Sequence, residues 1–200
     1  MMTTWNDLTN KIESKFPTFL GALSAPTDTN ALNEISALIE TSLPETFLNI
    51  YRHSDGEKLR ATGYVFGLSL LSTEKIVHEL KGWRDVIDQG LDGLSDSCTS
   101  HQEGKIKCEY ANTKWLPLLG DWSGNFIGLD FDPGPEGKQG QVINFGRDEE
   151  HKYVFADSLD EFMDLLDRLL ESAEITIDEE GGYAYQETHF IDALKELATQ

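Results

Sequence analysis

The sequence predicts an α+β fold in which a central, mainly antiparallel sheet packs against several helices. Four short runs rich in β-branched and aromatic residues follow one another within 114–156, separated by turn residues. On both sides of this stretch, apolar residues recur at steps of three and four positions, as they do in amphipathic helices. Strands joined by short turns form an antiparallel meander, and flanking helices would cover it.

The meander is the segment around which the rest of the chain is organised. Its predicted strands are Trp115–Leu119, Phe126–Phe131, Gln141–Phe145 and Lys152–Ala156. A turn containing Gly120, Asp121 and Gly124 joins the first two strands, and a Pro- and Gly-rich loop, Asp132–Gly140, precedes the third.

Three helices are predicted before the sheet. The first has its apolar stripe within 5–16 and ends before Pro17. The second follows a turn-rich segment and has its stripe within 32–39. The third starts with Pro44 as its first residue and ends near Gly56. One face of the sheet is the expected surface beneath them.

The segment between these helices and the meander is predicted to contain a strand, a helix and a loop. Thr62–Leu71 has the composition of a strand. Thr73 followed by Glu74 is expected to cap a helix with an apolar stripe within 76–87. Gly90–Lys107 shows no periodicity and is predicted to be a long surface loop.

After the meander, Ser158 and Glu161 have the spacing of a capping box for a helix with a stripe within 159–169. A short strand is predicted at Glu174–Ile177, then a turn or loop over 178–187, then a closing helix lined by Ile191, Leu194 and Leu197.

Length and composition indicate one globular domain covering residues 1–200. Hydrophobic residues make up 39% of the chain, which is enough to bury a core. The first residues lack the basic and apolar regions of a signal peptide, and no apolar run reaches membrane-spanning length. Two cysteines are too few for a disulfide scaffold. A cytoplasmic protein is therefore expected.

The net charge of −20 argues against nucleic acid and anionic membranes as partners, and favours a basic protein. Residues 148–187 alone hold 14 acidic side chains and two basic ones. A solvated surface is the simpler explanation of such a balance. The functional explanation is an acidic surface that attracts and binds a cationic partner.

No spacing in the sequence predicts a metal or cofactor. Cys98, His101 and Cys108 lack a fourth ligand and the knuckle typical of structural zinc, and the carboxylates within 130–136 do not complete a calcium loop. Strand ends and turns account for them.

Catalytic motifs are also missing from the sequence. Ser123 is not in a G-x-S-x-G elbow, the five histidines share no motif, and the glycine-rich segment 133–141 leads into a strand and lacks a P-loop pattern. An enzyme is therefore not expected. Trp115 is expected in the core, whereas Trp122 lies in a turn, so that exposure and burial stay open.

Two separated segments resemble the SUKH superfamily, which includes yeast cell-wall assembly regulators and many bacterial proteins. They are LPETFLNIYRHSDGE at 43–57, and KWLPLLGDWSGNFIGLDFDPGP with GKQGQVINFGRDEEHKYVFADSLDEFM from Lys114 onward. The matching positions are Leu43, Pro44, Gly56, Trp115, Pro117, Gly124, Asp130, Gly140, Val142 and Gly146. The family core would cover about 43–170, with a C-terminal elaboration over 172–200.

The resemblance implies a binding role without catalysis. Bacterial members are regarded as immunity proteins that neutralise toxins, many of them nucleases, and yeast members as regulatory scaffolds for glucan synthesis. Because almost the whole chain has the composition of an ordered protein, without long disordered tails, the leading hypothesis is an immunity protein that binds a cationic toxin domain. The alternative is a regulatory scaffold in cell-wall and glucan synthesis.

The acidic turns of the meander are the predicted contact surface, with Asp130 as the polar candidate among the family-matching positions. The predicted partner-binding residues are Asp121, Trp122, Asn125, Asp130, Asp132, Asp148, Glu149 and Glu150.

Overall fold

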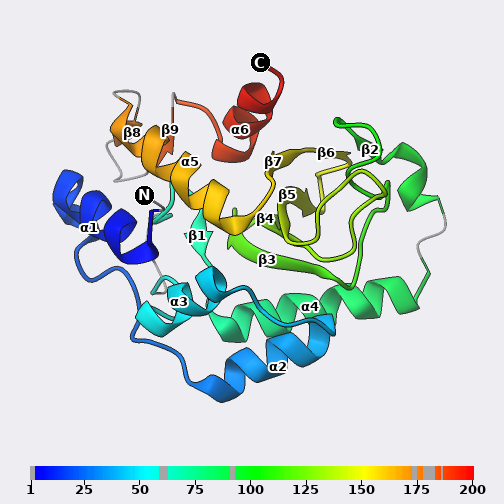
Figure 1. The fold of residues 1–200 in the computed structure, drawn as a ribbon, viewed down its shortest axis with the longest axis horizontal. Coiled ribbons are helices and arrows are strands. Elements are labelled where there is room, and N and C mark those ends of the chain that lie inside the picture. The colour runs from blue at the N-terminus through cyan, green and yellow to red at the C-terminus, as the bar shows by residue number, and fades with distance from the viewer. Residues whose placement is uncertain (1–2, 59–62, 91–92, 173–174, 178–182, 186) are drawn as a thin grey trace.

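The computed structural model describes residues 3–58, 63–90, 93–172, 175–177, 183–185 and 187–200. Its centre is a five-stranded sheet in the order β1-β3-β4-β5-β7, with every neighbouring pair antiparallel. The strands are β1 (Ser69–Leu70), β3 (Trp115–Gly120), β4 (Asn125–Asp130), β5 (Gln141–Gly146) and β7 (Val154–Ala156). Figure 1 shows this sheet at the middle of the fold, so the predicted α+β class and meander are confirmed.

The three long strands are buried along their whole length. Register between β4 and β5 is continuous, whereas β3 and β4 slip at Pro117, which has no N–H to donate to the ladder. Gly128 lies opposite Pro117, and a Cβ there would sit 2.0 Å from the carbonyl oxygen of Leu116. Glycine is therefore needed where the two backbones approach at the bulge.

Helices lie on both sides of the sheet. In Figure 1, α2 (Thr29–Ile39) and α4 (Thr73–Asp88) lie below it, and α5 (Leu159–Glu171) and α6 (Phe190–Ala198) lie above it. Coverage from both sides explains why these strands are continuously apolar instead of alternating. The helices α1 (Trp5–Lys15) and α3 (Glu45–His53) pack against each other and against α5. One hydrophobic cluster includes residues from Trp5 to Leu194.

The predicted helix starts are correct to within one or two residues. Ser158 caps α5 by accepting a hydrogen bond from the backbone of Glu161, but the Glu161 carboxylate accepts from the backbone N–H of Asp157, so the capping box is only half formed. Pro44 is the N-cap of α3, and not its first residue. The cap of α4 is Ser72 instead of Thr73.

The predicted strand at 62–71 is mostly wrong. Only Ser69–Leu70 is a strand, and the preceding residues form a tight turn in which the N–H of Gly67 donates to the carbonyl of Gly63. Both glycines, with φ of 86° and 91°, and Phe66, with φ of 53°, are in the left-handed region that an extended strand excludes. Residues 59–62 lie outside the described part of the chain.

The segment predicted as a long loop at 90–107 contains short elements. A 3-10 helix, η2 (Leu94–Ser97), leads to β2 (Thr99–Ser100), which pairs in parallel with β6 (His151–Lys152). This pairing attaches the segment to the turn after β5.

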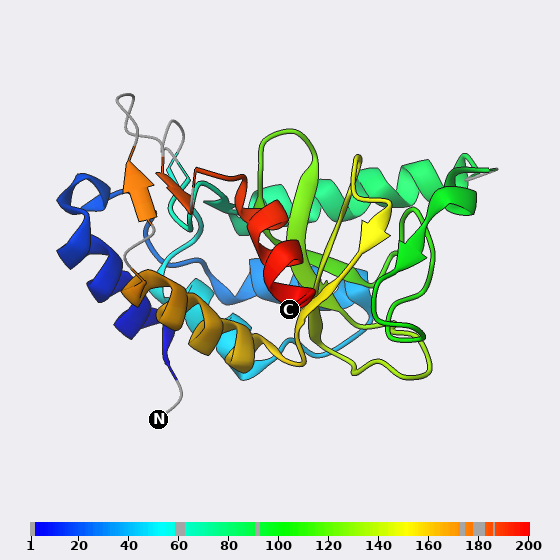
Figure 2. The same ribbon diagram turned by 90° about the horizontal axis from the view of Figure 1, so that it is seen from above.

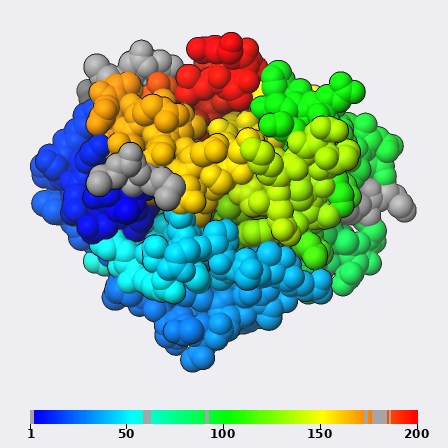
Figure 3. Space-filling view, in the orientation of Figure 1, coloured from blue at the N-terminus to red at the C-terminus, as the bar shows by residue number. Residues whose placement is uncertain are grey.

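The C-terminal segment forms a hairpin and a helix. β8 (Ile175–Ile177), which bears out the predicted strand, pairs with β9 (Tyr183–Tyr185), which lies where only a turn or loop was predicted. The apolar face of α6 is buried, at Phe190, Ile191, Ala193 and Leu194. Figures 2 and 3 show α6 lying on the body of the protein beside α5.

Candidate functional site

The turn between β3 and β4 is built around the carboxylate of Asp121. One carboxylate oxygen accepts hydrogen bonds from the backbone N–H groups of Ser123 and Asn125 at 2.8 and 3.0 Å, and the other accepts from the Asn125 side chain at 2.9 Å. Asn125 in turn accepts a hydrogen bond from the backbone N–H of Asp148 at 2.8 Å. The turn is thereby fixed to the neighbouring turn that follows β5.

This turn presents Trp122 to solvent in a strained conformation. The side chain is 67% exposed, and the backbone φ is 67°, in the left-handed region. For a residue other than glycine this region costs roughly 1–2 kcal/mol. Neither the exposed indole nor the backbone strain favours folding, and such a combination points to a function for the side chain.

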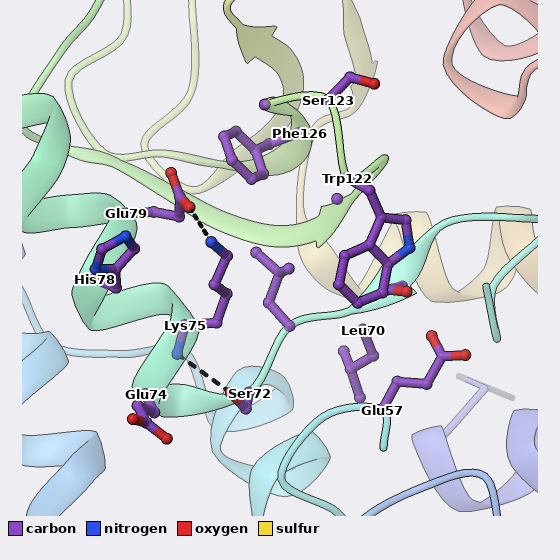
Figure 4. A pocket seen from close by; sticks show the side chains of 14 residues that line it. Glu57, Leu70, Ser72, Glu74, Lys75, His78, Glu79, Trp122, Ser123 and Phe126 are labelled. Atoms are coloured by element: carbon purple, nitrogen blue, oxygen red, sulfur yellow. Dashed lines mark hydrogen bonds and ion pairs between the residues drawn. The ribbon is translucent and has the colours of Figure 1, made fainter. Parts of the chain in front are cut away.

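Trp122 stands at the edge of a groove of about 640 Å³, shown in Figure 4. The groove lies between this turn, β1 and the first half of α4. Its floor is apolar and is formed by Leu70, Leu71, Gly120 and Phe126. A Cβ at Gly120 would lie 3.1 Å from the Leu71 side chain, so glycine keeps the floor from being filled.

The rim of the groove is acidic. It carries Glu57, Glu74 and Glu79 against a single lysine, Lys75, whose ammonium group lies 2.7 Å from the Glu79 carboxylate. His78 completes the rim on α4. The groove thus combines an apolar floor, an exposed aromatic ring and unbalanced negative charge.

Glu57 is the most constrained of the rim carboxylates. It accepts hydrogen bonds from the backbone N–H groups of Gly63 and Tyr64 at 3.0 and 3.1 Å. Burial raises the pKa of this carboxyl, and the hydrogen bonds oppose the rise. These contacts hold the carboxylate at the groove while using part of its acceptor capacity.

The structure separates the predicted contact residues into exposed and buried groups. Trp122 and Asp148 are exposed, and Asp121, Asp132 and Glu150 are partly exposed. Asn125, Asp130 and Glu149 are buried. Of the eight, only Trp122 lines the groove.

Asp130, predicted as a contact both as an acidic residue of the meander and as a family-matching position, is fully enclosed. Its carboxylate accepts hydrogen bonds from the indole of Trp115 at 3.1 Å, the backbone N–H of Asp132 at 2.9 Å and the side chain of Gln141 at 2.9 Å. Burial raises the pKa of this carboxyl to about 6 against the opposing effect of the hydrogen bonds. Asp130 therefore fastens the end of β4 to the strands beside it, and Trp115 is a core residue as predicted.

The other buried acid, Glu149, also has internal partners. Its carboxylate lies 2.9 Å from the ammonium group of Lys195 on α6 and accepts a hydrogen bond from Asn144. Asp132 forms an ion pair with Lys107 at 2.6 Å. Burial alone would raise the pKa of Asp132, but hydrogen bonds from Asn112 and Lys107 lower it below its ordinary value. These acids hold segments of the fold together.

The candidate metal ligands are not gathered into a site. Within the described residues, no group of three or more His, Cys, Asp or Glu side chains has an arrangement that could hold a metal ion. Cys98 is buried, Cys108 is exposed, and both are free thiols.

Sequence reasoning did not identify most of the groove. Glu57, Leu70 and the face of α4 that carries Lys75 and Glu79 come from three segments that meet only in the folded chain. The nearest local signal was Trp122 itself, because an aromatic residue between Asp121 and Ser123 in a turn has no strand or helix face on which to be buried.

A family model described as the SMI1 / KNR4 family (SUKH-1) matches residues 26–165. The chain belongs to the SMI1/KNR4 family. The match covers α2, α3 and α4, the whole meander and the first part of α5, and leaves out α1.

Three curated relatives of this SMI1/KNR4 chain are regulators by name. It is 34% identical to the cell wall biosynthesis/cell cycle regulator smi1 of Schizosaccharomyces pombe, over 78% of this chain and 35% of the relative. It is 29% identical to the cell wall assembly regulator SMI1 of Saccharomyces cerevisiae, over 74% of this chain and 36% of the relative. The glucan synthesis regulatory protein of Neurospora crassa is 26% identical, over 89% of this chain and 40% of the relative.

These comparisons favour the alternative hypothesis, regulation of cell-wall synthesis, over the leading hypothesis of an immunity role. The matched region spans 35–40% of the length of these three relatives. None of the three is named as an enzyme. In the described part of the chain, no helix is both long and apolar enough to cross a membrane.

Proposed function

We propose that this chain is a non-catalytic, protein-binding regulator of cell-wall glucan synthesis that acts in the cytoplasm. The observation that carries the proposal is the family match over residues 26–165, together with relatives whose names refer to cell-wall assembly and glucan synthesis.

The geometry supports binding to a protein. The groove beside Trp122 offers an exposed aromatic ring over an apolar floor, and aromatic side chains are enriched among residues that dominate binding energy. The net charge of −20 favours a cationic partner, because complementary charge accelerates association.

The test is deletion of the corresponding gene in the organism that makes the protein. We expect a changed content of wall β-glucan and a greater sensitivity to β-glucanase digestion, both reversed when the gene is restored. A wall of unchanged composition and resistance in the deletion strain would contradict the proposal.

Immunity against a cationic toxin is the second candidate, and the observation that favours it is the acidic charge alone. The same strains distinguish the two roles. An immunity protein would leave the wall unchanged on deletion and would protect cells only when a toxin is co-expressed.

A further inference from the structure

We propose that the groove beside Trp122 binds a short peptide segment of a partner protein that carries a lysine or arginine next to an apolar residue. The cation would lie against the indole of Trp122 and face the carboxylate of Glu57, while the apolar side chain would contact the floor at Leu70 and Phe126. This inference rests on the proposed protein-binding role and specifies the chemistry of its partner.

The charges of the groove favour a cation. The rim carries three glutamates and one lysine, and that lysine is already paired with Glu79 at 2.7 Å. Glu57 is held in place by two backbone N–H groups, so its position does not depend on the ligand. A lysine or arginine over the face of a tryptophan gains about 0.5–1 kcal/mol at exposed sites, and more where water is excluded.

The turn supplies Trp122 in a fixed position. Its backbone conformation is maintained by the Asp121 carboxylate, which is bonded to Ser123 and Asn125. An aromatic side chain on a rigid turn loses little conformational freedom on binding, which favours affinity.

A glucan oligosaccharide is the other ligand class that stacks on tryptophan. The observations favour the peptide because the net negative charge of the rim attracts a cation but not a neutral sugar, and the side chains of the apolar floor offer no hydrogen-bond partner to sugar hydroxyls. The oligosaccharide is therefore included in the test as a competing outcome.

The experiment is selection of short random peptides on the purified full chain, followed by fluorescence anisotropy titration of one selected peptide in low and high salt. We expect selected sequences to place Lys or Arg beside an apolar residue, and binding to weaken with salt. Two groove variants, Trp122→Gly and Glu57→Gln, are titrated beside the wild type.

The Trp122→Gly variant separates binding from folding. Glycine adopts a φ of 67° without strain, so this change should leave stability unchanged or higher while weakening binding by about tenfold or more. Trp122→Phe, which keeps an aromatic face, should retain part of the affinity. Glu57→Gln should weaken binding and reduce its salt dependence, with Glu171→Gln, an exposed acid outside the groove, as the matched control.

Four binding results would each overturn the inference: no selected peptide, a consensus without a basic residue, unchanged affinity in Trp122→Gly, or binding of a β-1,3-glucan oligosaccharide that depends on Trp122. The wall phenotype is scored separately. If a chain with Trp122→Gly restores the wall fully, the regulatory role stands and the groove inference fails. If peptides bind as expected but deletion leaves the wall unchanged, the binding chemistry stands and the proposed function fails.

Discussion

The buried carboxyl of Asp130 should make the stability of the protein depend on pH in a direction opposite to that of an ion-paired acid. Its pKa is raised to about 6 from the ordinary value of 3.8, mainly because burial disfavours the charged form. A carboxyl whose pKa is higher in the folded than in the unfolded chain favours folding when it is protonated. Its contribution is fully present below pH 3.8 and is lost as the pH rises through 6.

The size of this effect follows from the two pKa values. Linkage gives about 1 kcal/mol more stability from this group at pH 5 than at pH 7.5, and about 2 kcal/mol more at pH 4 than at pH 7.5. Other acids titrate over the same range, so the wild-type curve alone would not isolate it. Asp130→Asn removes this titration and leaves the others in place.

The assay is urea unfolding of both proteins at a series of pH values between 4 and 7.5, followed by circular dichroism. In the asparagine variant an amide NH2 group replaces one carboxylate oxygen, so at least one of the three hydrogen bonds to this side chain loses its acceptor. This loss changes the unfolding free energy by an amount that does not depend on the titration of residue 130. The difference, wild type minus variant, should rise as the pH falls. A difference that stays flat, or that falls with decreasing pH, would refute the assignment of a raised pKa to Asp130.

Two further predictions concern packing and thiol access. Gly128→Ala should lower the unfolding free energy by more than about 3 kcal/mol, because the new Cβ would meet the backbone oxygen of Leu116 at 2.0 Å. Gly82→Ala, with nothing within 4 Å in α4, is the control and should raise the unfolding free energy by about 0.5–1 kcal/mol in the same measurement. An aromatic disulfide reagent should modify Cys108 rapidly in the native protein and Cys98 only on unfolding, since Cys98 is buried and burial raises its pKa. Equal rates at the two thiols would contradict the placement of Cys98.

The meander could be predicted from sequence because its determinants are local. The runs of β-branched and aromatic residues, the Gly-containing turns and the Pro- and Gly-rich loop all lie within a few residues of the elements that they define. Thr62–Leu71 satisfied the same composition rule and was mostly not a strand. Gly63 and Gly67 adopt positive φ there so that Phe66 can pack against Phe190, a partner more than a hundred residues away. Composition does not report such a contact.

The sequence shows that the predicted contact surface is acidic, but it does not show how deeply each acidic side chain is buried. Asp130 and Asp132 are separated by one residue, yet the first is enclosed by Trp115 and Gln141 and the second lies at the surface beside Lys107. Asp130 is the last residue of β4, which is buried along its whole length, whereas Asp132 lies in the loop beyond the strand, and only the folded chain shows where that burial ends. The groove was missed for a related reason, since it joins segments that are far apart in the chain.

The immunity hypothesis relied partly on the ordered composition of the chain, which lacks the long tails expected of a scaffold. That reasoning assumed that the sequence could be compared with whole relatives. The matched region is only 35–40% of three relatives that are named as cell-wall or glucan regulators, so the order within it does not distinguish the two roles.

Apart from Gly124, which belongs to both sets, the positions that carry the family resemblance and the residues of the groove have different roles. Gly56, Gly124 and Gly140 have positive φ, Trp115 and Val142 are buried, and these properties specify the framework in any member that shares them. Trp122, with its exposed indole, is not one of the family-matching positions. Its turn is nevertheless held in place by hydrogen bonds to Asp121 and by the contact between Asn125 and Asp148. A family match therefore identifies the scaffold and leaves the partner open. Because Trp122→Gly should spare the fold while removing the ring, it tests the part of the function that the resemblance does not reach.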